Sequence, residues 1–117
     1  MNANINIEDF KEYALMRLDG DFNSAEDNEN LLNSFRELSK KGYTAILVDL
    51  TSVIYLNSGS IGVLLSGNAI LKKKDCKMIL FGASDYLENI FNVTKLNLAL
   101  DICRTYEEAI DSLKQKS

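Results

Sequence analysis

The chain has 117 residues, of which 46% are hydrophobic and 26% charged, as is typical of one compact soluble domain. Its net charge of −4 argues against a nucleic-acid partner, since binding nucleic acid requires a basic face. Histidine is absent and no segment approaches the ~20 apolar residues of a membrane span, so we expect a cytoplasmic protein with no metal, no cofactor and no membrane contact.

The first half of the chain reads as two strands, a helix and a third strand. Residues 4–8 alternate weakly, and a clear strand at residues 13–18 is followed by Asp19-Gly20-Asp21, a turn signal. A helix is predicted over residues 25–40, with Ser24 as its N-cap. The near-continuous apolar run at residues 44–50 is typical of a central strand covered on both faces, and Asp49 is interpreted as a turn residue at its end.

The second half continues the alternation of helices and strands. A helix is predicted from about Ser60 to Lys73, and a buried strand over residues 77–81. Ser84 then caps a further helix, and residues 99–103 form a short last strand. Thr105 caps the last helix, where Glu108 completes a capping box.

This order predicts an α/β fold, with one domain over residues 1–117 and a core at about 13–113. The sheet is mixed and largely parallel, with four to five strands flanked by about four helices. Sites in such sheets form at the carboxyl ends of the strands. Residues 20–22 and residues 57–60, Asn57-Ser58-Gly59-Ser60, are therefore expected to meet at one end.

Ser58 is the residue on which the functional interpretation depends. A hydroxyl at the start of a helix lies beside unpaired backbone N–H groups and the positive end of the helix dipole. Such a serine is either an N-cap or a place for a phosphate. The pattern alone favours the cap, and no other motif in the chain offers competing chemistry.

The helix that follows is predicted to have a face almost without side-chain bulk. At 3.6 residues per turn, Ser58, Gly62, Ser66 and Ala69 fall on one side, and Gly67 points inward. A mid-helix glycine costs roughly 0.5–1 kcal/mol relative to alanine, so Gly62 calls for a reason. Either a partner packs against this face, or the glycine is neutral or packs within the chain.

The sequence resembles the STAS domain family, and more narrowly its stand-alone bacterial anti-sigma factor antagonists. The most specific part is Y-L-N-S-G-S-I-G at residues 55–62, supported by residues 87–113, with the whole match running from about Tyr13 to Leu113. The family usually has Asp-Ser, a small residue, Gly, an aliphatic residue and often a second Gly. The segment at residues 106–109 also resembles the usual start of the family's last helix.

The resemblance implies a set of site residues. Ser58 falls on the phosphorylated serine of the family and Asn57 on its preceding aspartate, while Ser60, on the usual glycine, is a second candidate acceptor. The residues implied in partner binding are Gly20, Asp21, Asn57, Ser58, Gly59, Ser60, Gly62, Ser66 and Ala69. No residue is predicted to be catalytic or to bind a metal. The chain departs from the family at Asn57 and at Ser60.

The resemblance also implies a mechanism of partner switching. The unphosphorylated protein, a monomer or weak dimer, would bind an anti-sigma factor with serine kinase activity and so release the sigma factor. Phosphorylation of Ser58 would abolish that binding, and a phosphatase would reset the protein. Two alternatives stay open. One is a STAS scaffold or accessory subunit that is never phosphorylated, of a lipid-transport or stressosome-like kind. The less favoured one is a small nucleotide-binding protein, since the sequence has no phosphate-binding glycine motif.

Overall fold

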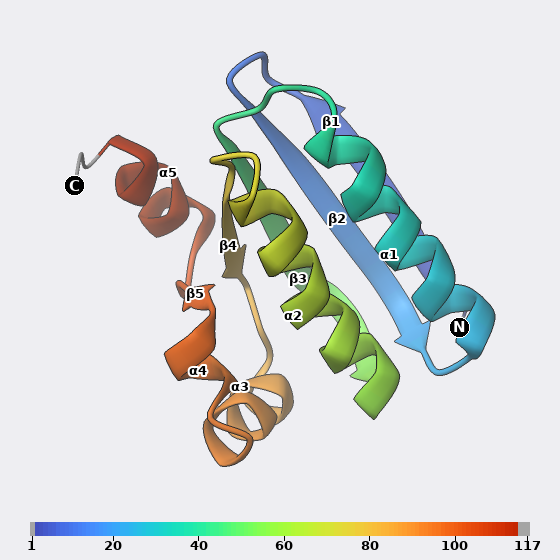
Figure 1. The fold of residues 1–117 in the computed structure, drawn as a ribbon. Coiled ribbons are helices and arrows are strands. Elements are labelled where there is room, and N and C mark those ends of the chain that lie inside the picture. Colours follow the sequence, from blue (N-terminus) through green and yellow to red (C-terminus); the bar gives the residue numbers. More distant parts are fainter. Residues whose placement is uncertain (1, 115–117) are drawn as a thin grey trace.

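The computed structural model describes residues 2–114 as an α/β domain built on a five-stranded sheet (Figure 1). The strands lie in the order of the sequence, β1-β2-β3-β4-β5, with β1 antiparallel to β2 and all other neighbours parallel. This is the predicted fold class. The elements are β1 (Asn4–Asp9), β2 (Tyr13–Phe22), α1 (Ala25–Ser39), β3 (Ala45–Leu56), α2 (Ser58–Lys72), β4 (Lys77–Phe81), α3 (Asp85–Val93), α4 (Leu96–Ala99), β5 (Asp101–Ile102) and α5 (Tyr106–Lys114).

Helices cover both faces of the sheet. Figure 1 shows α1 and α2 side by side across one face. There Phe35 and Leu64 join a large core with even-numbered strand residues such as Val48. Odd-numbered residues such as Leu47 point to the opposite face, where α5 covers them through Ala109. The central strand β3 is therefore apolar on both faces, as its sequence predicted.

Two strands run further than the sequence indicated. The turn predicted at Asp19-Gly20-Asp21 is wrong, because β2 continues to Phe22 and pairs there with Leu56 at the end of β3. The pairing shifts register between Arg17 and Asp19 and again between Gly20 and Asp21, and Gly20 has a φ of 84°. Glycine adopts this left-handed conformation without strain, so the signal marks an irregularity within a strand. Asp49, expected at a strand end, lies inside β3.

The helix boundaries follow from their caps. Ser24, Ser84 and Thr105 each accept a hydrogen bond from a backbone N–H three residues on, as predicted. The helix predicted from Ser60 begins at Ser58 instead. The four-residue helix α4 was not predicted, and because it extends to Ala99, the strand expected from that residue shrinks to β5.

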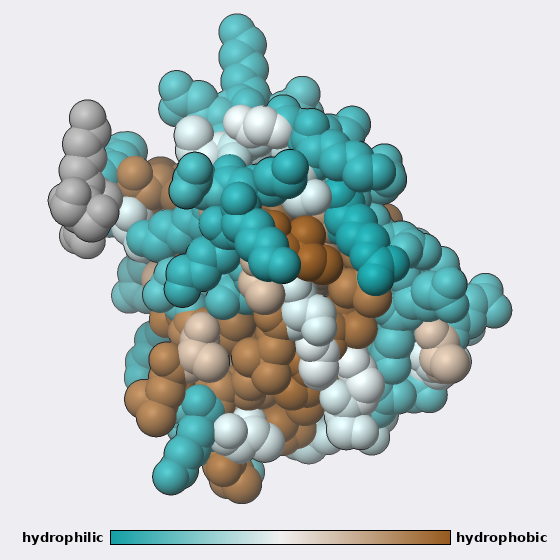
Figure 2. All heavy atoms as spheres, in the orientation of Figure 1, coloured by the Kyte–Doolittle hydropathy of each residue, from teal (hydrophilic) through white to brown (hydrophobic). Residues whose placement is uncertain are grey.

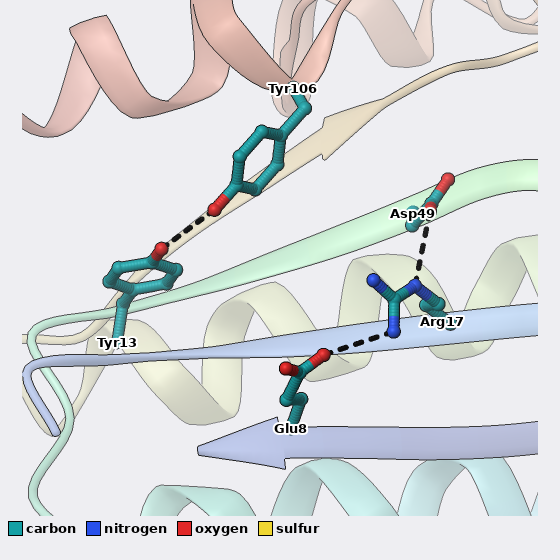
Figure 3. Close-up of polar contacts among 5 residues, drawn as sticks. All are labelled: Glu8, Tyr13, Arg17, Asp49 and Tyr106. Carbon is teal, nitrogen blue, oxygen red and sulfur yellow. Dashed lines mark hydrogen bonds and ion pairs between the residues drawn. The ribbon is translucent and has the colours of Figure 1, made fainter. Parts of the chain in front are cut away.

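Polar contacts also lie on the side of the sheet that α5 covers (Figure 3). The hydroxyls of Tyr13 and Tyr106 lie 2.7 Å apart and join β2 to α5. Burial and this hydrogen bond raise the pKa of Tyr13 to about 12. Further along β2, Arg17 forms ion pairs with Glu8 at 3.0 Å and with Asp49 at 3.8 Å. Asp49 thus belongs to a surface ion-pair network.

Candidate functional site

The end of β2 meets the start of α2, as the sequence predicted. The backbone N–H of Asn57 donates to the carbonyl oxygen of Phe22 at 3.0 Å. Within β2, Gly20 is buried opposite Val53, and Asp21 is half-buried opposite Tyr55. The residues implied on β2 and those at the start of α2 therefore belong to one end of the sheet.

Asn57 is the N-cap of α2. Its backbone is extended, with φ −83° and ψ 177°, and its Oδ1 accepts the backbone N–H of Ser60 at 2.8 Å. The same oxygen accepts Nδ2 of Asn28, from α1, at 3.0 Å. The amide oxygen of Asn57 thus does the capping for which an aspartate oxygen would serve, so this departure from the family pattern leaves the cap intact.

Ser60 is fully buried beneath this cap. Its Oγ lies 2.6 Å from Oδ1 of Asn28, 2.9 Å from Oδ1 of Asn57 and 2.9 Å from the carbonyl oxygen of Phe22. A hydroxyl has one hydrogen, so it donates to one of these three acceptors at a time. The Ser60 side chain therefore holds α1, β2 and the α2 cap together from inside.

Asn28 is the member of this network that sequence reasoning missed. It lies near the start of α1 and is half-buried, and it connects to Asn57 across 29 residues of sequence. An asparagine early in a helix is a common surface residue. No pattern around it indicates a partner on another helix, so only the packing of α1 against α2 reveals it.

Ser58 is the first residue of α2 and its side chain is exposed. Since Asn57 supplies the cap, Ser58 is not needed for it. The first turn of α2 contains no acidic residue, so the positive end of the helix dipole is not neutralised there. The structure therefore places an accessible hydroxyl at a helix start that favours negative charge.

The glycines of α2 fall into three different surroundings. A Cβ at Gly62 would meet nothing within 4 Å, so that residue faces open space as predicted. A Cβ at Gly67 would lie 2.5 Å from the Phe35 ring, so that glycine allows α2 to approach α1 closely. A Cβ at Gly59 would lie 2.5 Å from Nδ2 of Asn28, so any larger residue there would displace the Asn28 amide from the polar network.

The open side of α2 continues into an apolar surface. Ser58, Gly62, Ser66 and Ala69 are all exposed along it, as the helical projection predicted. Figure 2 shows apolar atoms gathered over α2 and the neighbouring region of α3 and α4. The exposed side chains of these helices include Leu65 on α2, Val93 on α3 and Leu98 on α4, the last of which is 80% exposed. Contiguous apolar surface of this kind is typical of a protein-interaction site.

Within residues 2–114 no group of three or more acidic or cysteine side chains is placed to hold a metal ion. Over the same residues, no helix is long and apolar enough to cross a membrane. Cys76 is buried, and burial raises the pKa of its thiol to about 11, so it is a packed side chain with little thiolate at neutral pH.

Comparison with known proteins places the chain in a family. The STAS domain model matches residues 4–109. An anti-sigma-B factor antagonist of Listeria monocytogenes is 34% identical over 55 residues, which is 47% of this chain and 48% of that protein. The aligned stretch therefore spans about half the length of this curated relative.

Solved structures share the fold. An anti-sigma factor antagonist from Mycobacterium paratuberculosis is 15% identical, with a TM-score of 0.85 and coverage of 97% of this chain and 96% of that one. The Bacillus cell fate determinant SpoIIAA gives a TM-score of 0.74 in its unphosphorylated form, at 20% identity over 97% of this chain and 100% of that one. The phosphorylated form of SpoIIAA gives a TM-score of 0.71 at 21% identity, with coverage of 94% of this chain and 99% of that one. At these identities the likeness shows the fold alone. The match of the STAS domain model over residues 4–109 shows that the chain belongs to the STAS domain family.

Proposed function

We propose that the protein is an anti-sigma factor antagonist, not an enzyme, that works by partner switching controlled by phosphorylation of Ser58. The observation that carries the proposal is the division of roles at the start of α2. Asn57 caps the helix, and the neighbouring Ser58 hydroxyl is exposed and free of that structural duty. Relatives that are anti-sigma factor antagonists support the same function.

The site can hold a phosphate without a change of fold. A phosphoserine adds about −1.5 to −2 charges. At Ser58 these would face the backbone N–H groups of the first turn, where no acidic side chain competes. Asn57 contributes to this because its amide caps the helix without adding a negative charge beside the phosphate.

In the unphosphorylated form, the exposed stripe of Gly62, Ser66 and Ala69 would receive the anti-sigma factor. Asp21, Asn57, Gly59 and the backbone at Gly20 would belong to the same end of the interface. The absence of side-chain bulk at Gly62 lets a partner approach the helix backbone. A hydrated dianion at Ser58 would then lie at the edge of the contact, and a loss of about 3 kcal/mol would weaken binding over a hundredfold. A separate phosphatase would restore the binding form.

Ser60 does not suit the role of phosphate acceptor. Its side chain is fully buried and its Oγ bonds to other polar atoms at 2.6–2.9 Å. A kinase would have to pull the start of α2 away from Asn28 to reach it. We therefore assign the modification to Ser58 alone and a structural role to Ser60.

The test is phosphopeptide mass spectrometry on the protein from its native cells, with Ser58→Ala as the control. We expect phosphate on Ser58 and none on Ser60. A second test is capture of the anti-sigma factor by Gly62→Leu, which we expect to stay folded and to lose the partner. Asn33→Leu, which introduces the same side chain at an exposed position of α1 beside β1, away from this surface, should keep the partner. Unchanged affinity of Gly62→Leu would rule out the stripe as the docking site.

The alternative of a permanent STAS subunit rests on Asn57, where the family usually has an acid. It predicts stable co-purification with one partner and an unmodified Ser58. Finding phosphate on Ser58 would exclude it, whereas its absence under all growth conditions, together with a constant partner, would favour it over partner switching.

A further inference from the structure

The outer edge of β1 is an unprotected strand edge. β1 stands at the end of the five-strand order and pairs on one side with β2 in a regular register, without a bulge. Within residues 2–114 no strand lies on its other side. Its sequence, NINIED, contains no proline and no lysine, and its two charged residues, Glu8 and Asp9, stand together at its C-terminal end. Figure 1 shows β1 beneath α1 at the rim of the sheet.

The backbone groups that face outward can be identified from the β1–β2 hairpin. The N–H of Phe10 donates to the carbonyl oxygen of Tyr13. Hydrogen-bonded residues alternate along an antiparallel strand, so the even-numbered residues of β1 bond to β2. The N–H and C=O groups of Ile5, Ile7 and Asp9 therefore point away from the sheet and are positioned to bond to another strand.

We propose that this edge pairs with β1 of a second copy of the chain, antiparallel and around a two-fold axis at Asn6. With a two-fold axis perpendicular to the sheet, the α1-covered faces of both copies lie on the same side of the combined sheet. Side chains directly opposite each other must then come from positions of the same parity. With Asn6 opposite Asn6 of the second copy, Ile5 faces Ile7, and Asn4 faces Glu8.

This register is favoured over its two neighbours. In this register the outward N–H and C=O groups of Ile5 and Ile7 all form hydrogen bonds to the second copy. Those of Ala3 and Asp9 can extend the ladder. A shift that centres the axis on Ile7 would place Asp9 against Ile5, while one centred on Ile5 would leave Asp9 beyond the pairing. In the Asn6 register two isoleucine pairs form on the α1 side of the sheet, and no like charges face each other.

The surface on the α1 side suits these isoleucines. A groove of about 600 Å³ runs between β1 and α1, and Ile7, Leu38 and Tyr43 are among its lining residues. Ile7 is 42% exposed at present. A second strand at the edge would bring its own Ile5 and Ile7 beside this groove, so burial of apolar surface would add to the backbone hydrogen bonds.

The contact is small, which sets the kind of assembly expected. Five paired residues span about 17 Å of strand. An interface of that length lies below the roughly 1,200 Å² of stable complexes, so we expect a dimer that forms and dissociates with concentration. The strand β2 lies between β1 and β3, the strand that leads into α2, so pairing at the outer edge of β1 would leave Ser58 exposed in both copies. The inference therefore stands independently of the proposed function.

Sedimentation velocity on the full chain, from about 1 to 500 μM, tests this pairing. Asn6→Lys and Asn4→Lys make the same substitution two residues apart, and we expect them to change the stability of the dimer in opposite directions. Asn6→Lys places two lysines face to face at the axis and should weaken the dimer about fivefold. Asn4→Lys places a lysine opposite Glu8 of the second copy, twice per dimer, and should strengthen it about fivefold.

Asn92→Lys, at an exposed position of α3, is the control and should leave the dissociation constant unchanged. Both effects should shrink at 0.5 M salt, because the added charges are exposed. A chain that stays monomeric to 500 μM would overturn the proposal, and so would equal shifts for the two β1 variants. Circular dichroism of each variant would verify that its fold is retained.

Discussion

Asn28 donates its side-chain amide to Oδ1 of Asn57 over 3.0 Å and thereby joins the start of α1 to the cap of α2. The two helices also share the buried hydroxyl of Ser60. The position of Ser58 is consequently set by contacts from a different helix as well as by its own. This network leads to a first prediction on Gly59, whose missing Cβ leaves room for the Asn28 amide.

Gly59→Ala should destabilise the protein by about 1–3 kcal/mol, because its Cβ would lie 2.5 Å from Nδ2 of Asn28. In an Asn28→Ala background only the 3.2 Å approach to Oδ1 of Asn57 remains, so Gly59→Ala should cost clearly less there, since alanine is also the better helix former. Urea denaturation of the two single variants and the double variant measures this coupling. Additive free energies would contradict the packing described here.

A second prediction compares Gly62 and Gly67, the two glycines in the middle of α2, each of which serves as the control for the other. Gly62→Ala should stabilise the protein by about 0.5–1 kcal/mol, because the site is open and alanine favours the helix. Gly67→Ala should destabilise it by about 1–3 kcal/mol, because its Cβ would press on the Phe35 ring. Thermal or urea unfolding separates the two. Similar effects at both positions would show that α2 does not pack on α1 as closely as described.

A third prediction concerns the hydrogen bond between the hydroxyls of Tyr13 and Tyr106. Tyr13→Phe or Tyr106→Phe should each cost about 1 kcal/mol, because each removes the hydrogen bond and leaves one hydroxyl half-buried. The double variant should cost less than the sum, since no unpaired hydroxyl remains. A double-mutant cycle on unfolding free energies gives the coupling. A coupling near zero would mean that water replaces the bond and that ring packing against Phe10 and Phe81 holds α5 in place.

The alternation of strands and helices was predictable because hydrophobic periodicity is a local property. The buried run of β3 and the caps at Ser24 and Ser84 could be located without knowledge of their neighbours. The open side of α2 could be predicted for the same reason, since a helical projection uses only the residues of that helix. These predictions depended only on residues within one turn or one strand.

The errors at Gly20 and Asn28 involved contacts between distant segments. The signal at Gly20 fits a turn or an irregular strand equally well, and pairing with β3 decides for the strand. The role of Asn28 depends on the approach of α1 to α2, which no local pattern contains. Ser60 was a second candidate acceptor through its place in the family motif, and in the structure Phe22 and Asn28 close over it.

The last prediction concerns alkaline pH. Burial raises the pKa of the Cys76 thiol from its ordinary value of 9.0 to about 11. Between these values the unfolded chain has lost a proton that the folded chain keeps, so stability must fall as pH rises from about 9 through 11, and no loss from this group occurs below 9. By pH 10.5 the loss should reach about 1–2 kcal/mol. Cys76→Ala lacks the titrating group, so its unfolding free energy should decline less between pH 8 and 10.5, even though its cavity lowers stability at both. Parallel declines for the two proteins would show that the thiol is already accessible to water in the folded state.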